Sequence, residues 1–162
     1  MNTSSPDLDA HTRALFTRPA RRLVLFIMIL AVAIAFASSQ NGQGRTLVAQ
    51  GDAQRADYLY FSALASYQQA AARAPHDPEP LLRMGELYLA LGQYVEAMHA
   101  FAQASQRGGS TPAVHGGLAH ALAAHGDWDS AAHHWRQVIA QRPADAQARL
   151  ELARVLMAQS KW

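Results

Sequence analysis

A spacing of 34 residues recurs through most of this 162-residue chain and restricts its fold more than any other feature. The stretch GQYVEAMHAF at 92–101 and the stretch GDWDSAAHHW at 126–135 share one skeleton of Gly, aromatic, Ala and aromatic residues. The same Ala-x3-aromatic spacing occurs earlier, at Ala63 and Tyr67. The skeleton places no nucleophile beside a base, so it indicates packing and not catalysis.

The repeated skeleton predicts pairs of antiparallel helices. Each Ala-x3-aromatic motif begins the core of a second helix. The apolar runs of the matching first helices lie at 81–88, 115–122 and 149–156. Gly92 and Gly126 are expected to end first helices, because glycine readily adopts the left-handed conformation that closes a helix. Pro75 and Pro143 end second helices, and Gly109 has that role in the middle copy.

These motifs resemble the tetratricopeptide repeat (TPR), a helix-turn-helix unit of 34 residues. The resemblance covers 44–162 and implies an all-α superhelix of antiparallel helix pairs with about three and a half repeats. The repeats are 44–77, 78–111, 112–145 and the partial 146–162. The first repeat departs from the pattern at Gln50 and Gln54, where apolar residues are usual, but it keeps Gly51.

Packing explains why the motif repeats. Ala97 and Ala131 are expected to be small because two helices cross there, and axes about 8–10 Å apart leave little room for a larger side chain. Phe101 and Trp135 lie one turn later on the same face and are expected to fill the wedge between repeats. A lone helical hairpin cannot bury both of its faces, so neighbouring hairpins must stack.

The last partial repeat carries more apolar residues than one neighbouring helix can cover. They are Leu150, Leu152, Val155, Leu156, Met157 and Trp162. A terminal helix normally has a polar outer face. The pattern therefore favours either a longer repeat array or an edge completed by a partner, with an ordinary cap as the third alternative.

An uncharged apolar run at 23–37 precedes the repeats. At about 1.5 Å per residue it spans roughly 22 Å, and Ser38 and Ser39 bring it to the lower end of the transmembrane range. We expect a cytoplasmic basic tail at 1–22, a single transmembrane helix or signal anchor at 23–39, and a linker at 40–43. Signal cleavage after Ala37, at the small-x-small motif Ala-Phe-Ala, is the main alternative, and a buried core helix is another.

The distribution of charge predicts the orientation of the chain. Four basic residues precede the apolar run, namely Arg13, Arg18, Arg21 and Arg22. From residue 38 onward, ten Lys and Arg balance ten Asp and Glu, so the repeats have no basic stripe for nucleic acid. The positive-inside rule keeps the N-terminus in the cytoplasm, which places the TPR domain outside the cytoplasm, in the bacterial periplasm. A cleaved and secreted protein is the alternative.

The repeats lack the motifs of catalysis and of cofactor binding. There is no cysteine, and the paired glycines are not followed by the Lys-Ser/Thr of a phosphate loop. His115, His120 and His125 are spaced by five, which turns each about 140° from the last around a helix, so they cannot share a face. We expect no cofactor and no metal site. Metal binding by His99 and His133, at equivalent places in neighbouring repeats, is a minor alternative.

The TPR resemblance implies that the first helices line a concave groove that takes a protein or peptide partner. The residues that would face it are Leu82, Arg83, Glu86, Leu89, Gly116, Gly117, His120, Leu150, Glu151 and Arg154. Arg83 and Glu86 could equally be a solvent-exposed i, i+3 ion pair. The family's clamp for the terminal carboxylate of chaperone peptides needs several Lys, Arg and Asn here. Because Leu, Gly or Ala occupies most of those places, the sequence does not favour that activity.

The sequence therefore predicts a non-enzymatic, membrane-tethered scaffold for protein–protein interaction in the bacterial cell envelope. Its layout is similar to that of the repeat-bearing accessory proteins of cytochrome c maturation. The alternative is the N-terminal docking portion of a longer enzyme or secretion component, with a catalytic part beyond residue 162.

Overall fold

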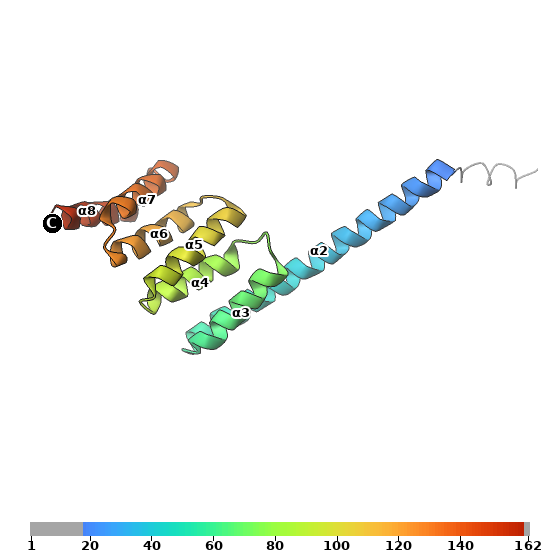
Figure 1. The fold of residues 1–162 in the computed structure, drawn as a ribbon, viewed down its shortest axis with the longest axis horizontal. Helices are drawn as coiled ribbons and strands as arrows, with labels where there is room; N and C mark the ends of the chain where they lie inside the picture. Colours follow the sequence, from blue (N-terminus) through green and yellow to red (C-terminus); the bar gives the residue numbers. More distant parts are fainter. Residues whose placement is uncertain (1–17, 161–162) are drawn as a thin grey trace, which may run out of the picture. The chain divides into compact units, whose positions relative to one another are not determined.

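The computed structural model describes residues 18–160, except for the side chains of residues 18–22, 36–38, 40 and 41. The regular secondary structure in this range is entirely α-helical, as the sequence predicts (Figure 1). The helices are α2 (Arg18–Ala56), α3 (Tyr60–Arg73), α4 (Glu79–Ala90), α5 (Tyr94–Gly108), α6 (Pro112–His125), α7 (Trp128–Gln141) and α8 (Ala146–Gln159).

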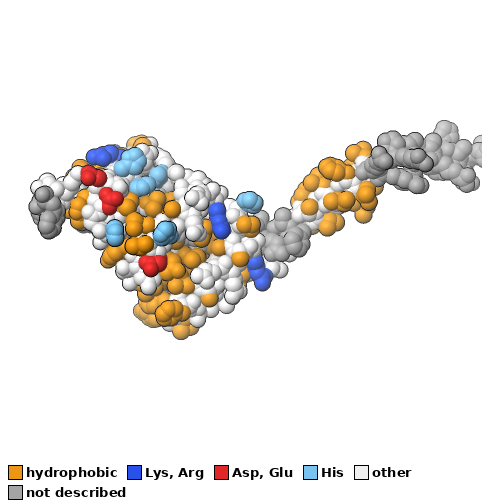
Figure 2. Space-filling view, in the orientation of Figure 1, with side chains coloured by type: hydrophobic (Ala, Val, Ile, Leu, Met, Phe, Trp, Pro, Cys, Tyr) orange, Lys and Arg blue, Asp and Glu red, His pale blue; other side chains and the backbone are white. Residues whose placement is uncertain are grey.

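The chain divides into two compact units between Gln40 and Asn41. The described part of the first unit is the N-terminal part of α2. Side chains from Leu23 to Leu30 are 48–64% exposed, and Figure 2 shows a largely hydrophobic surface on the face of this segment in view. Residues 40–43, which the sequence suggests as a linker, lie inside α2.

The transmembrane helix expected at 23–39 is not supported by the structure. Among the residues described, no helix combines the length and the apolar character needed to cross a membrane. The side chains at 36–38 lie outside the described residues, as do 1–17 of the predicted cytoplasmic tail.

The second unit is a row of antiparallel helical hairpins. We call Asn41–Ala56 of α2 with α3 the first hairpin, α4 with α5 the second, and α6 with α7 the third; α8 packs on α7. Consecutive helices from α3 to α8 contact one another, and α4 also contacts α6. The first helices of the second and third hairpins thus approach each other directly, and we call the side formed by the first helices the inner face of the row.

The small residues of the repeat lie where helices cross, as predicted. Ala97 and Ala131 are fully buried, and Phe101 and Trp135 are almost fully buried. The ring of Phe101 lies between two glycines of successive first helices. A Cβ atom would come within 2.7 Å of this ring at Gly85 and within 2.4 Å at Gly117. These glycines therefore allow α5 to pack closely against both α4 and α6.

Glycine ends three of the helices at the predicted residues. Gly92, Gly109 and Gly126 have φ of +73°, +79° and +94°, in the left-handed region that other residues rarely adopt. The chain can therefore reverse directly after α4, α5 and α6. Helices α3 and α7 end at Arg73 and Gln141, each two residues before a proline.

The first hairpin compensates for its polar departure from the repeat pattern. The side-chain oxygen of Gln54 accepts a 2.7 Å hydrogen bond from the hydroxyl of Ser66, which is buried in α3. Gly51 lies against the buried ring of Tyr67, and a Cβ atom there would be 2.4 Å from the ring. Hydrogen bonding thus replaces an apolar contact, while the close approach at glycine is retained.

Helix α8 exposes several large apolar side chains, as the sequence suggests. Leu150, Leu156 and Met157 are 46%, 39% and 57% exposed, whereas Val155 is buried against α7. The last residue of that set, Trp162, lies outside the described residues.

Candidate functional site

Four polar side chains occupy one repeat position on the inner face. They are Asp52, Glu86, His120 and Arg154, each 34 residues from the next. The side chains of Asp52 and Glu86 are 44% and 37% exposed, and His120 and Arg154 are exposed. The row therefore presents polar groups at the surface of the first helices.

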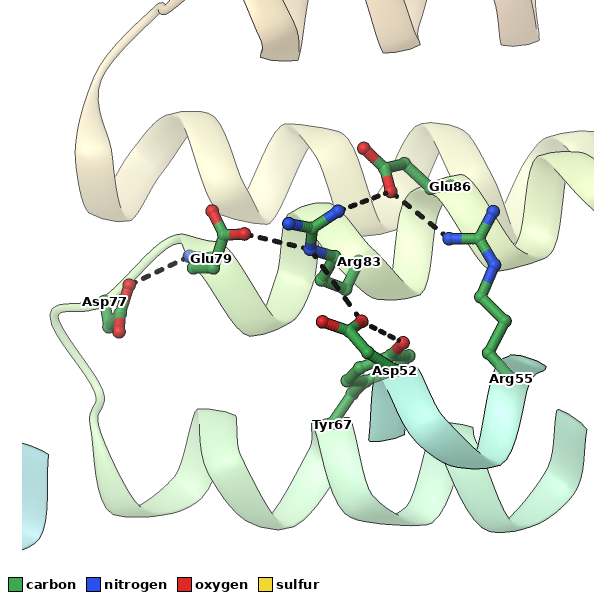
Figure 3. Close-up of polar contacts among 7 residues, drawn as sticks. All are labelled: Asp52, Arg55, Tyr67, Asp77, Glu79, Arg83 and Glu86. Atoms are coloured by element: carbon green, nitrogen blue, oxygen red, sulfur yellow. Dashed lines mark hydrogen bonds and ion pairs between the residues drawn. The ribbon is translucent and has the colours of Figure 1, made fainter. Parts of the chain in front are cut away.

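The N-terminal end of this row belongs to a network of ion pairs, which we call the charged cluster: Asp52, Arg55, Glu79, Arg83 and Glu86 (Figure 3). An Nη1 atom from Arg55 and one from Arg83 each lie 3.3 Å from the same oxygen of Glu86, Oε2. The Nε atom of Arg83 lies 2.9 Å from Glu79 Oε1 and 4.0 Å from Asp52 Oδ1. All five side chains are 35–44% exposed, so this network joins α2 to α4 at the surface.

The ionisation of Arg83 responds to these neighbours. Its partial burial lowers the pKa of the guanidinium, but the carboxylates of Glu79, Glu86 and Asp52 outweigh burial and raise the pKa above its usual value. Arg83 is therefore a permanent cation with three acidic neighbours.

A buried hydroxyl holds one end of the charged cluster in place. The phenol of Tyr67, in α3, donates a 2.7 Å hydrogen bond to Asp52 Oδ1. Burial and the Asp52 carboxylate raise the pKa of Tyr67, so the phenol stays protonated and continues to donate. Near the other end, the backbone N–H of Glu79 donates to the Asp77 carboxylate at 3.0 Å, where α4 begins.

Two of the predicted groove residues, Gly116 and Gly117, lie against aromatic rings of the neighbouring helices. Gly117 lies on the ring of Phe101, and a Cβ atom at Gly116 would be 3.7 Å from the ring of Trp135. The imidazole of His120 meets Trp135 edge to face, with ring centroids 4.9 Å apart. Both rings are buried, so among these three predicted groove residues it is His120 that is exposed.

A hollow of about 160 Å³ adjoins the charged cluster. Pro78, Leu82, Ala113 and Val114 form much of its wall, and Glu79 belongs to both the hollow and the charged cluster. The hollow is therefore suited to an apolar side chain, and the carboxylate of Glu79 lies at its edge.

The remaining predicted groove residues have different surroundings. Leu82 and Leu89 are partly buried and pack against core clusters. Leu150 is exposed on α8. Glu151 and Arg154 form their own ion pair at 2.9 Å, and Glu151 also accepts a hydrogen bond from Gln147. The structure thus joins Arg83 and Glu86 in one network, while Glu151 and Arg154 pair with each other.

Asp52, Arg55 and Glu79 belong to the site but are not among the groove residues predicted from the sequence. Asp52 precedes Glu86 by one repeat length, and Arg55 precedes Leu89 by the same 34 residues. Extending the groove positions back by one repeat would have found both. Glu79 lies four residues before Arg83, the spacing of a helical ion pair.

A pair of histidines in the third hairpin is likewise not predicted from the sequence. His115 in α6 and His134 in α7 have their Nδ1 atoms 2.9 Å apart, close enough for one proton to bridge them. Burial lowers the pKa of both imidazoles; His133 lowers that of His115 further, and His115 and His133 lower that of His134. No group of three or more metal-ligating side chains occurs within the described residues.

Comparison with known proteins agrees with the geometry. Two family models described as tetratricopeptide repeat match residues 47–121 and 117–162. No curated protein matches the chain in sequence.

Solved structures share the fold at low sequence identity. The first TPR domain of Spaghetti (RPAP3) bound to the HSP90 peptide SRMEEVD has a TM-score of 0.71 and 18% identity, covering 74% of this chain and 98% of that one. The second TPR domain of human RPAP3, in complex with the HSP70 peptide SGPTIEEVD, has a TM-score of 0.66 and 20% identity, covering 74% and 97%. The Yersinia enterocolitica secretion chaperone SycD, in complex with a peptide of the translocator YopD, has a TM-score of 0.61 and 18% identity, covering 72% and 89%.

The stacked hairpins, the small residues at their crossings and the two family models together show that this chain belongs to the tetratricopeptide repeat family.

Proposed function

We propose that this protein is a non-catalytic scaffold that holds an extended segment or helix of a protein partner along the inner face of its TPR domain. The observation that carries the proposal is the row Asp52, Glu86, His120 and Arg154, which presents polar side chains at one repeat position on successive first helices. The charged cluster and the apolar hollow beside this row offer a partner both ionic and apolar contacts. Fold relatives that bind peptides add support by analogy.

Site-specific photocrosslinking tests this proposal. Benzoylphenylalanine is placed in turn at His120, at Arg154 and, as a control, at Arg136, which is exposed on the second helix α7. Both inner-face positions are expected to capture the same partner, and the control is expected to capture little of it. Equal capture from Arg136 would count against a groove on the inner face.

We further propose that the partner belongs to the bacterial cell envelope, with the apolar segment at 23–39 as a tether and the TPR domain in the periplasm. The support is the uncharged apolar run after four arginines, together with the exposed side chains from Leu23 to Leu30. Assembly of an envelope complex, such as the machinery of cytochrome c maturation, is the role this layout suggests. Cleavage after Ala37 would release the TPR domain into the same compartment.

Protease treatment of intact spheroplasts tests the location. The TPR domain is expected to be degraded without detergent, and its protection would overturn the proposed topology. Extraction with alkaline carbonate distinguishes a tethered chain, which stays in the pellet, from a cleaved one. The alternative function, as the docking portion of a longer enzyme or secretion component, predicts that the reading frame continues past Trp162 into a catalytic domain.

A further inference from the structure

The charged cluster has a charge balance that bears on the partner. It contains three carboxylates and two guanidinium groups, which gives a net charge of −1. Both arginines already lie within 3.3 Å of a carboxylate oxygen. An incoming carboxylate would have to compete with Asp52, Glu79 and Glu86 for these arginines, and it would be repelled by those that it did not displace.

The carboxylates of the charged cluster are open to a cation. Their side chains are 37–44% exposed, and an ionised carboxylate offers about four acceptor sites. Glu86 uses the single oxygen Oε2 for both arginines, and Tyr67 keeps Asp52 in place by donating to it. A basic side chain can therefore add to this network without breaking it.

The hollow is continuous with the charged cluster through Glu79, which lines the hollow and pairs with Arg83. Leu82, Ala113 and Val114 give the hollow an apolar wall. A partner side chain seated there brings the neighbouring residues of the same segment to the carboxylates.

We propose that the charged cluster and the hollow together select a partner segment with an apolar side chain next to a basic one, and that they reject segments ending in acidic residues. This inference rests on the proposed function, since it names the chemistry of the segment that the inner face holds. Asp52, Glu79 and Glu86 are its specificity-determining residues.

Fluorescence anisotropy on the full chain tests the inference with two labelled peptides. The acidic probe is SRMEEVD with a free C-terminus, and the basic probe is SRMKKVR with an amidated C-terminus. We expect the basic probe to bind about tenfold or more tightly than the acidic one at low salt, and this ratio to shrink as salt screens the charges. Equal or tighter binding of the acidic probe, or no binding of the basic probe, would overturn the inference.

Variants show whether the charged cluster causes the preference. The double substitution Asp52→Asn with Glu86→Gln should lower the basic-to-acidic ratio about tenfold. Glu96→Gln, at an exposed carboxylate on the second helix α5, is the control and should leave the ratio within about twofold. If circular dichroism shows that the double variant does not fold, Glu79→Gln is used in its place. Ala113→Phe, which fills the hollow, should weaken the basic probe about fivefold. If the basic-to-acidic binding ratio is unchanged in every variant of the charged cluster, the proposed selectivity is wrong.

The two proposals can fail separately. Suppose that position His120 captures the partner, but the basic-to-acidic binding ratio does not change in the variants of the charged cluster. The proposed selectivity would then be rejected and the proposed scaffold function kept. Loss of position dependence in crosslinking would reject the scaffold, whichever peptide binds.

Discussion

The first and third hairpins share one packing skeleton but join their helices with different polar groups. In the first hairpin, Tyr67 donates to Asp52 and Ser66 donates to Gln54, both at 2.7 Å. In the third hairpin, the link is the pair of Nδ1 atoms of His115 and His134, 2.9 Å apart.

The difference is one of chemistry and not of fold. A tyrosine hydroxyl that donates to a carboxylate keeps its proton around neutral pH. Burial and the charge of Asp52 raise the pKa of Tyr67 further. Two imidazoles can share one proton only while at least one of them is neutral, and histidine titrates near neutral pH. The repeat skeleton therefore tolerates different helix links, and the third hairpin carries the one that acid can break.

The largest effect should come from testing how closely each hairpin packs on its aromatic ring. Gly51→Ala puts a Cβ atom 2.4 Å from the ring of Tyr67, which is fully buried and anchored by Asp52. We expect it to lower the free energy of unfolding by about 1–3 kcal/mol through overpacking.

The matched control is Gly116→Ala in the third hairpin, where the new Cβ atom would be 3.7 Å from Trp135, an ordinary contact. It should stabilise the protein by up to about 1 kcal/mol, because alanine favours a helix over glycine. Denaturant unfolding measures both changes, and losses of equal size would contradict this account of the glycines.

A smaller effect should follow from breaking the polar link of the first hairpin. Tyr67→Phe removes the hydroxyl that donates to Asp52 but keeps the buried ring. We expect a loss of about 1–2 kcal/mol, as for a hydrogen bond to a charged group. Tyr58→Phe, at a tyrosine that is 78% exposed in the turn after α2, is the control and should change little. If the two variants unfold alike, the Tyr67–Asp52 hydrogen bond contributes no stability.

The mildest effect should be an acid sensitivity of the third hairpin. Burial and neighbouring imidazoles lower the pKa of His115 and His134 in the folded chain, so the unfolded chain binds protons more readily. The stability that this pair contributes is complete above the ordinary histidine pKa of about 6.5, and it is lost as the pH falls through that value toward the lowered pKa values.

The double variant His115→Leu with His134→Met should therefore show a flatter dependence of Tm on pH between about 7.5 and 5.5 than the unaltered chain. His76→Gln, at an exposed histidine, should leave the pH dependence as it is. A parallel fall of Tm in the double variant and the unaltered chain would show that the pair is not the acid-sensitive group.

Most of the fold could be predicted from the sequence because its determinants are local and repeat. The helix-ending glycines at 92 and 126 and the alanines at 97 and 131 act within one hairpin, so one spacing places them all. The outline of the groove follows from the same spacing. This is why Arg83 and Glu86 were expected on one face.

The chemistry of the site could not be predicted in the same way, because it depends on how one helix crosses the next. His115 and His134 are 19 residues apart, and Arg55 and Glu86 are 31 apart, so neither pair has a helical spacing. Neither the spacing of histidines along one helix nor their equivalence between repeats predicts the pair that forms between α6 and α7. The first repeat departs from the pattern at Gln50 and Gln54, and its groove positions, Asp52 and Arg55, are absent from the predicted set.

The position of Phe101 has a consequence for how the row of hairpins comes apart. Its ring, carried by α5, touches Gly85 in its own hairpin and Gly117 in the next one. In repeat proteins, the contact between neighbours decides whether units melt singly or together. Opening the third hairpin exposes one side of this ring to solvent, so it also removes packing that stabilises the second hairpin. The second and third hairpins should therefore behave as one cooperative block, whose amides exchange with solvent through openings of one common free energy.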